Sequence, residues 1–290
     1  MPNQKLRRSE NVDGDFYVDS SCIDCATCRW MAPDVFNAQG GMSAVYRQPA
    51  NDAQRTAALR AVVACPTASI GVTAPASRAG LKHAVASFPY ELADGVHHCG
   101  FHSESSFGAA SYFIKRADGN VLVDSPRFAA PLVKRISELG GIRWMFLTHR
   151  DDVADHAKWA AKFGCVRIIM ASDARGIEAG TKLKGDDEYE IANGLTVIPT
   201  PGHTRGSACL LYDDKFLFTG DHLAWSQRLG HLYAFRSACW YDWDTVVESL
   251  KRLIPKRFEW VLPGHGWPLH ADTAEVARQM RQCVEWAESA

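Results

Sequence analysis

Four short segments in the second half of the chain place histidine or aspartate where an apolar run ends. They read Thr-His-Arg-Asp-Asp at 148–152, Pro-Gly-His-Thr at 201–204, Gly-Asp-His at 220–222 and Pro-Gly-His-Gly at 263–266. The apolar runs have the length and composition of buried strands. Because side chains at neighbouring strand ends converge, these segments predict one open pocket of several imidazoles and carboxylates. Such a set of side chains is suited to metal ions.

A second set of candidate ligands lies in the first quarter of the chain. Cys22, Cys25 and Cys28 form a C-x2-C-x2-C pattern, and Cys65 stands before Pro66. Three thiolates at this spacing can bind three irons of one cubane, and a distant Cys-Pro supplies the fourth ligand. Zinc sites favour two separated cysteine pairs instead. The pattern predicts one 4Fe-4S cluster, and a three-iron form stays open if Cys25 is a weak ligand.

Charge and composition argue against several classes of partner. The net charge is −1 and the basic residues are scattered, which does not favour a nucleic acid or an anionic membrane as partner. No apolar run approaches the roughly 18 residues of a membrane span, and the N-terminus lacks the apolar core of a secretory signal. Nine cysteines are a poor set for disulfides because the number is odd. We therefore expect a cytoplasmic protein whose clustered cysteines bind metal.

Hydrophobic periodicity predicts both hairpins and β-then-α units, which suits a sheet-rich core with helices on its outer faces. The expected strands are 15–19, 111–115, 121–124, 142–147, 166–170, 195–198, 208–212, 215–219 and 258–262. The expected helices are 52–63, 132–139, 153–163, 245–253 and 271–286. A stretch of small residues around Pro75 shows no apolar period. We expect a small domain at 1–75, a linker at 76–86 and a larger domain at 87–290.

Both parts of the chain resemble known families. Residues 12–72, with their four cysteines, resemble single-cluster 4Fe-4S ferredoxins. The histidine and aspartate segments, together with Asp124 at an earlier strand end, resemble the metallo-β-lactamase superfamily over residues 87–290. The resemblance implies a mixed α+β and α/β chain. It would consist of an αββα sandwich with a metal pocket along one edge, preceded by a small ferredoxin-like α+β domain.

The resemblance also implies which residues bind each of two metal ions. The matching residues are His149 and His203 for the first ion, Asp155, His156 and His265 for the second, and Asp221 as the carboxylate between them. His222 has no ligand counterpart in the family. We expect it either to face a ligand or the substrate or to have a structural role.

One departure from the family motif H-x-H-x-D-H concerns the metal. Asp151 stands where the second histidine is expected, and the gap from His149 to Asp155 is longer than in the motif. We expect Asp151 to be an oxygen ligand, and the alternatives are ligation by Asp152 or a cap of the following helix. Flavodiiron proteins, which are relatives within the superfamily, also have a carboxylate at this position. An oxygen-rich set favours iron or manganese over zinc.

Three further residues are candidates for contact with substrate. His102 belongs to a histidine-rich segment at 97–103, and Tyr241 belongs to an aromatic segment at 237–243. Arg127 could hold an anionic substrate. The alternatives are a surface turn for the first segment and packing between domains for the second.

A cluster domain in front of such a pocket is compatible with three functions. We expect first an oxidoreductase, in which the cluster passes electrons to one or two irons acting on a small substrate, O2 or NO. The alternative is a zinc hydrolase of an ester, thioester or lactone with a structural or regulatory cluster. The third is a non-catalytic electron-transfer protein. The expected partners are a small-molecule substrate and a ferredoxin or reductase as electron donor, and a homo-oligomer is left open.

Overall fold

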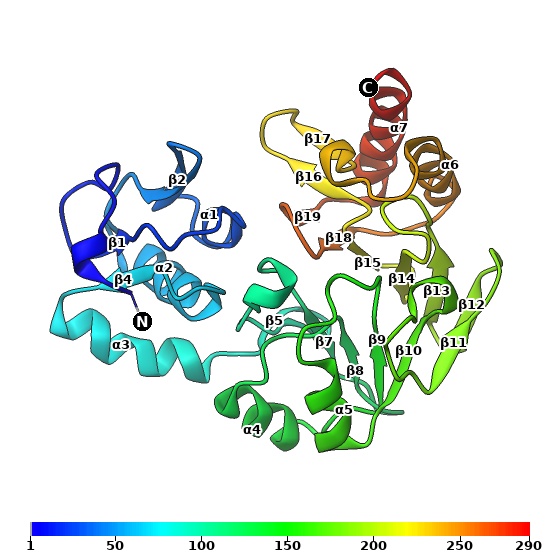
Figure 1. Cartoon of the computed structure of the whole chain (residues 1–290), viewed down its shortest axis with the longest axis horizontal. Coiled ribbons are helices and arrows are strands. Elements are labelled where there is room, and N and C mark those ends of the chain that lie inside the picture. The colour runs from blue at the N-terminus through cyan, green and yellow to red at the C-terminus, as the bar shows by residue number, and fades with distance from the viewer. Residues whose placement is uncertain (1) are drawn as a thin grey trace. The chain divides into compact units, whose positions relative to one another are not determined.

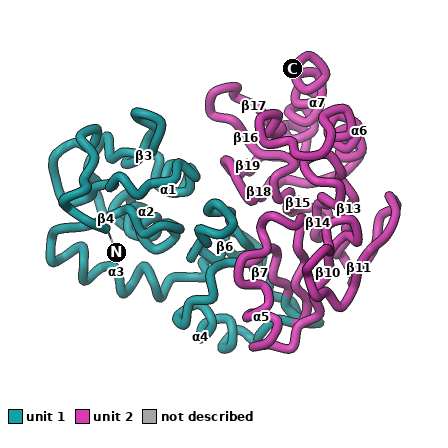
Figure 2. Tube along the Cα trace, viewed as in Figure 1, with its two compact units in different colours: residues 1–120, 126–142 teal, residues 121–125, 143–290 magenta. Residues whose placement is uncertain are grey.

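The computed structural model describes residues 2–290, and the chain divides into two compact units (Figure 2). Unit 1 contains the described residues up to Asn120 together with Pro126–Ile142. Unit 2 contains Val121–Ser125 and Arg143–Ala290. Unit 1 therefore extends well beyond the small domain expected at 1–75.

The first part of unit 1 is a small α+β module. Strand β1 (Phe16–Val18) pairs antiparallel with β4 (Ile70–Val72), and β2 (Phe36–Gln39) pairs antiparallel with β3 (Met42–Val45). Helix α1 (Thr27–Met31) carries one of the cysteines, and α2 (Asp52–Ala64) ends directly before Cys65. The side chain of Asn51 caps α2 by accepting a hydrogen bond from the Gln54 amide. The pairing of β1 with β4 brings the two cysteine-bearing segments, which are distant in sequence, to one place (Figure 1).

The linker expected at 76–86 is helical, because these residues belong to helix α3 (Pro75–Ala86). The segment has no apolar period, but its composition supports a helix. Pro75 occupies the first helical turn, where the missing N–H is tolerated. Alanine, leucine and lysine, which follow it, are strong helix formers.

The rest of unit 1 contributes three short antiparallel strands and one helix. Strand β5 (Tyr90–Ala93) pairs with β6 (Val96–His98), and β6 pairs with β7 (Tyr112–Ile114). The expected strand at 111–115 is thus confirmed, whereas β5 and β6 were not predicted. Helix α4 (Ala130–Glu138) lies close to the predicted range.

Unit 2 contains one parallel and one mainly antiparallel group of strands. The parallel group is β8 (Val121–Val123), β9 (Trp144–Phe146), β10 (Val166–Met170) and β11 (Thr181–Leu183). The second sheet has the order β12 (Tyr189–Ala192), β13 (Leu195–Pro199), β14 (Ala208–Tyr212), β15 (Phe216–Gly220), β18 (Trp260–Pro263) and β19 (Leu269–His270). Strands β14 and β15 are buried throughout, which explains why they appear in the sequence as continuous apolar runs.

Helices α6 (Trp243–Leu253) and α7 (Thr273–Ser289) pack against the second sheet (Figure 1). Leu250 and Met280 meet Leu217 and Val261 in one buried apolar cluster. Helix α5 (His156–Phe163) follows β9 and its loop, and a small hairpin, β16 (Ala224–Ser226) and β17 (His231–Tyr233), follows β15. Within residues 2–290, no helix combines the length and the apolarity that crossing a membrane requires.

Candidate metal centre

The candidate metal centre lies in unit 2, where side chains from four loops meet. His149 follows β9, His203 follows β13, Asp221 follows β15 and His265 follows β18. Each loop begins at the carboxyl end of a strand, as the sequence predicts. Strands β15 and β18 are parallel neighbours in the sheet although a hairpin and a helix separate them in the chain, so Asp221 and His265 leave the sheet side by side.

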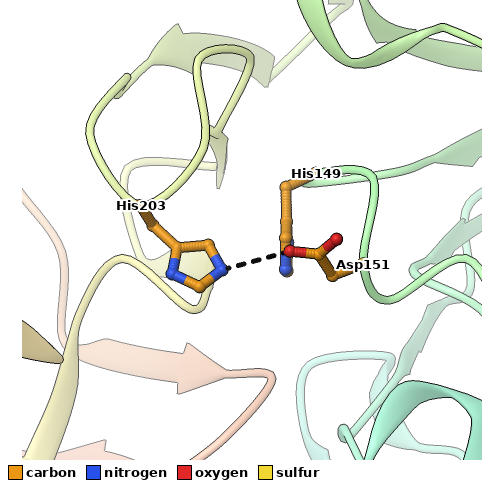
Figure 3. Close-up of side chains that lie close together, drawn as sticks. All are labelled: His149, Asp151 and His203. Carbon is orange, nitrogen blue, oxygen red and sulfur yellow. Dashed lines mark ion pairs between the residues drawn. The ribbon is translucent and has the colours of Figure 1, made fainter. Parts of the chain in front are cut away.

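Two overlapping groups of side chains have ligand atoms within 4.8 Å of one another: His149, Asp151 and His203 form one, and His149, Asp152 and Asp221 form the other. In the first group, His203 Nε2 lies 3.7 Å from an Asp151 carboxylate oxygen (Figure 3). In the second, His149 Nε2 lies 3.9 Å from Asp152 and 3.8 Å from Asp221. His203 Nε2 is also 3.7 Å from Asp221, so Asp221 lies beside both histidines.

The donor atoms of this centre fit a metal ion. His149 Nε2, His203 Nε2 and Asp152 Oδ2 are buried and have no hydrogen-bond partner among the described residues. Buried polar atoms without a partner cost about 1–3 kcal/mol each, so such atoms pointing at one another indicate a site for a cation. Separations of 3.7–3.9 Å are slightly wider than those between atoms that ligate one ion at about 2.0–2.2 Å. Imidazole and carboxylate are both common ligands of zinc and iron.

The protonation of these side chains supports the same interpretation. Burial, together with the negative charge of Asp221, raises the pKa of Asp152 well above its usual value. A carboxylate at this position therefore needs a positive partner. Burial would raise the pKa of Asp221 too, but the charge and hydrogen bond of His265 outweigh it and hold that pKa low. Burial lowers the pKa of His149 to about 4, which keeps its imidazole neutral and able to ligate.

A hydrogen-bond network behind His149 fixes which ring nitrogen faces the centre. Thr148 donates its backbone N–H and its hydroxyl to the Asp124 carboxylate at 2.8 and 3.0 Å. The hydroxyl oxygen then accepts from His149 Nδ1 at 3.0 Å, so Nε2 carries the lone pair that points into the centre. Asp124 is in the left-handed region, with φ of 56°, at the end of β8. This unusual backbone conformation places its side chain behind the ligand loop.

Asp173, which the sequence did not single out, holds two of the ligand loops together. Its carboxylate accepts from the backbone N–H of Arg150 at 3.1 Å, the Thr204 hydroxyl at 2.5 Å and the Gly206 N–H at 2.9 Å. Asp173 is buried. It therefore links the loop of His149 to the loop of His203. No local pattern marks it, because the residues around it form a single 3-10 turn.

Asp155 and His156, expected as ligands of a second metal, lie outside both groups of converging side chains among the described residues. Asp155 is the N-cap residue of α5 and pairs with Lys158 at 2.7 Å. His156 Nδ1 lies 3.1 Å from the guanidinium of Arg167. The longer gap after His149 moves this pair onto the start of the helix. Asp152, which stands nearer to His149, occupies the space beside Asp221 instead.

His265, also assigned to a second metal, contacts Asp221 directly. Its Nδ1 lies 2.8 and 2.9 Å from the two carboxylate oxygens. His222 is buried, and neither of its ring nitrogens has a partner among the described residues. Burial and the nearby charge of His203 lower the pKa of His222 to about 3, so this ring is neutral.

The three candidates for substrate contact have different positions. Tyr241 is 51% exposed in unit 2. It follows Trp240, whose backbone N–H donates to the His203 carbonyl. His102 is fully buried in unit 1. Arg127 is also in unit 1, where its backbone N–H donates to Phe101. Only Tyr241 of these three belongs to the unit that holds the candidate metal centre.

The four cysteines expected to bind the cluster converge in unit 1. Cys22, Cys25, Cys28 and Cys65 line one small cavity together with the apolar side chains of β1 and β4. Each has a free thiol in the structure. The side-chain set fits a 4Fe-4S cluster, which takes four thiolates in an apolar surrounding.

Comparison with known proteins agrees with the family predicted for each of the two parts of the chain. A model of the metallo-β-lactamase superfamily matches residues 93–284. The chain belongs to the metallo-β-lactamase superfamily. A model of the 4Fe-4S single cluster domain of ferredoxin I matches residues 18–72. The expected fold, a metallo-β-lactamase domain preceded by a small ferredoxin-like domain, is confirmed.

Several curated relatives are named hydroxyacylglutathione hydrolase. The one from Rhizobium meliloti is 31% identical over 138 residues, which cover 46% of this chain and 51% of the relative. The one from Acidiphilium cryptum is 28% identical over 178 residues, 60% of this chain and 66% of the relative. The chain thus spans about half to two thirds of the length of these relatives.

Solved structures show the same fold at lower identity. The DIM-1 metallo-β-lactamase has a TM-score of 0.53 and 19% identity, with 68% of this chain and 95% of that chain covered. The BLEG-1 B3 metallo-β-lactamase has a TM-score of 0.54 and 17% identity, with 66% and 99% covered. These structures agree with the metallo-β-lactamase fold that the sequence predicts.

The loop geometry of the centre predicts that replacing Gly220 by a larger residue destabilises the protein strongly. Its φ is +49°, and a Cβ there would lie 2.4 Å from Thr148 Oγ1 and 3.2 Å from His149 Nδ1. We expect Gly220→Ala to reduce the free energy of unfolding by more than the roughly 1–2 kcal/mol of a left-handed residue alone. Gly164→Ala is the matched control, because its φ is +64° and a Cβ there meets nothing within 4 Å. Urea unfolding of both variants measures the difference, and equal losses would contradict the close packing of β15 against the His149 loop.

Proposed function

We propose that this protein is a metal-dependent hydrolase of a thioester or related ester. The observation that carries the proposal is that unpartnered, buried donor atoms of His149, His203 and Asp152 converge beside Asp221, an arrangement that fits a metal ion. The curated relatives named hydroxyacylglutathione hydrolase support a thioester as the substrate class. The hydrolase alternative therefore takes precedence over the oxidoreductase that the sequence first suggested.

In this proposal His149, Asp151 and His203 would hold one ion, and Asp152 and His265 would take part in holding a second. Asp221 contacts His149, His203 and His265 and would contribute its carboxylate to the centre. A bound metal of this kind polarises a carbonyl oxygen and lowers the pKa of water toward neutrality. Asp124 and Thr148 keep the Nε2 of His149 aimed at the centre. Asp173 keeps the two loops at a fixed separation.

The exposed side of the centre is where substrate would enter. Asp151 is the exposed member of its group, with 43% of its side chain accessible, whereas His149 and His203 are buried. Trp240 and Tyr241 are 62% and 51% exposed, and the ring centroid of Trp240 lies 6.3 Å from that of His203. A backbone hydrogen bond from Trp240 to His203 fixes this aromatic pair at the centre. These two rings can exclude water from one side of a bound acyl group.

Assays of the metal-replete protein with a hydroxyacylglutathione test the proposal directly. We expect thioester hydrolysis with kcat/KM of at least about 10⁴ M⁻¹s⁻¹, and loss of activity when a chelator removes the metal. Restoration by zinc or iron identifies the ion. Absence of hydrolysis of thioesters, esters and lactones by protein that contains one or two such ions would contradict the proposal.

The second candidate function is the oxidoreductase, which the match to a single-cluster 4Fe-4S domain and the exposed carboxylate of Asp151 favour. The same preparation separates the two candidates. Electron-dependent consumption of O2 or NO by the iron-loaded protein, without hydrolysis, would support the oxidoreductase. In that case a ferredoxin or a reductase would be the electron donor.

A further inference from the structure

A continuous line of buried polar side chains runs from the cluster cysteines into the segment that matches the metallo-β-lactamase superfamily. Cys25 Sγ lies 3.4 Å from the Thr27 hydroxyl, and that hydroxyl lies 3.1 Å from His102 Nδ1. His102 Nε2 lies 2.8 Å from His98 Nε2. Thr27 is 2% exposed, and both histidines are 0% exposed. All four residues belong to unit 1.

The carbonyl of Gly108 decides the direction of these hydrogen bonds. His102 Nδ1 lies 2.7 Å from the Gly108 oxygen, and because a carbonyl only accepts, Nδ1 must carry the hydrogen. His102 Nε2 then has a lone pair, and His98 Nε2–H donates to it. Burial, with the charges of His102 and Arg60, holds the pKa of His98 well below 6.5. A neutral His98 with one N–H agrees with this assignment.

Thr27 has two acceptors within reach of its single hydroxyl hydrogen. One is the Gly108 oxygen at 3.3 Å, to which the hydroxyl donates. The other is the Cys25 sulfur at 3.4 Å, which donates to the Thr27 oxygen as a free thiol and becomes an acceptor only when it is deprotonated. When Cys25 binds iron its sulfur is a thiolate, which accepts hydrogen bonds. The thiolate is the stronger acceptor because it is charged. The His102 Nδ1–H lies 3.1 Å from the Thr27 oxygen and 2.7 Å from the Gly108 oxygen, so it competes for that carbonyl and favours a Thr27 hydroxyl that donates to the sulfur.

Gly108 keeps this arrangement compact. Its φ is +85°, and a Cβ there would lie 2.9 Å from Cys25 Sγ and 3.0 Å from Pro66 Cγ. The loop that contains Gly108 therefore packs directly on the cysteine loop. A larger residue would displace both Cys25 and the carbonyl that His102 binds.

We propose that His102 is a positioning residue for the 4Fe-4S cluster, which orients the Thr27 hydroxyl toward Cys25 and so raises the reduction potential of the cluster. A hydrogen bond donated to a cysteine sulfur stabilises the extra negative charge of the reduced cluster, and hydrogen bonds to sulfur are among the determinants of cluster potential. The proposal rests on a cluster bound by the four cysteines. It is independent of the reaction at the metal centre of unit 2.

The test is a potentiometric titration of the full-length protein, prepared without oxygen and followed by the visible absorption and electron paramagnetic resonance of the cluster. Thr27→Val removes the hydroxyl at nearly constant volume. We expect a roughly tenfold less favourable equilibrium constant for reduction. For one electron this corresponds to a reduction potential that is lower by about 59 mV. Thr27→Ser restores the hydroxyl and should return the potential to that of the original protein. An unchanged potential in Thr27→Val would overturn the proposal.

A double-mutant cycle tests the role of His102. His102→Phe keeps a ring beside His98 but frees the Gly108 carbonyl, so the Thr27 hydroxyl turns away from Cys25 and the potential falls. Both changes remove the same hydrogen bond. The reduction potential of the double variant Thr27→Val with His102→Phe should therefore be no lower than that of Thr27→Val alone. Fully additive shifts, or an unchanged potential in His102→Phe, would overturn the positioning role.

Two further variants serve as controls. The Ser69 hydroxyl lies 3.3 Å from Cys65 Sγ, so Ser69→Ala should lower the potential by itself and add to the effect of His102→Phe. Thr56→Val makes the same chemical change as Thr27→Val at an exposed position of α2 and should leave the potential unchanged. Iron content is measured for every variant. Should Thr27→Val fail to hold four irons, the potential of His102→Phe decides, because His102 reaches Cys25 through Thr27.

Discussion

Asp221→Asn is expected to reduce kcat/KM for thioester hydrolysis by more than about 100-fold and to reduce the metal content of unit 2. Asp221 is the carboxylate that lies beside both His149 and His203, at 3.8 and 3.7 Å, and it also contacts His265. Asparagine keeps the shape but removes the negative charge that compensates a cation. Loss of residues that merely orient a ligand already costs about 10–100-fold in affinity or activity, so loss of a shared ligand should cost more. Elemental analysis and steady-state kinetics measure the two effects.

Asp214→Asn is the matched control for this substitution. Asp214 is exposed in the turn between β14 and β15 and has a φ of 48°, a conformation that asparagine tolerates well. Metal content and activity should stay at the level of the original protein. If Asp221→Asn retained its metal and lost less than about threefold in kcat/KM, the carboxylate would not be part of the reacting centre.

Cys28→Ser is expected to reduce the iron of the cluster from about four atoms per chain to fewer than one. Cys28 is buried on α1 and lines the same cavity as the other three cysteines. Burial raises the pKa of its thiol, so the sulfur is a thiolate only when a cation compensates the charge. Serine offers a harder and shorter ligand that cannot replace the thiolate in this apolar cavity. Iron analysis and the visible absorption of the anaerobic protein measure the loss.

Cys165→Ser provides the control for loss of a thiol as such. Cys165 is buried at the start of β10 in unit 2, away from the cysteines of the cavity in sequence, and burial raises the pKa of its thiol as well. We expect its iron content to be unchanged. A Cys28→Ser protein with the full four irons would show that another residue completes the ligand set.

The regular elements near the two sets of ligands could be predicted because their signals are local. The strand at 166–170 and the helix from Asp52 agree with β10 and α2 almost residue for residue. The alternation of apolar runs and turn residues also predicted that His149, His203, Asp221 and His265 follow strands. These signals require only the periodicity of the backbone and the chemistry of turns.

The loop between β9 and α5 could not be predicted, because its conformation depends on distant contacts. The family motif suggested Asp155 and His156 as ligands, whereas the structure places them at the start of a helix. What holds the loop is Asp173, a residue from another segment that accepts the Arg150 amide hydrogen. A pattern within the loop contains no information on that contact. The ligand roles of Asp151 and Asp152 stay predictions until metal is measured.

The contact between Gly108 and the cysteine loop also affects how the gene for such a protein can change. Gly108 lies in the segment that matches one family, and Cys25 and Pro66 lie in the segment that matches the other. We therefore expect that neither segment can be replaced by its counterpart from another protein without a change in the other segment. A ferredoxin module transplanted from another source would meet a loop shaped for different neighbours. We expect inheritance to keep the two segments together, with substitutions at their junction occurring in pairs.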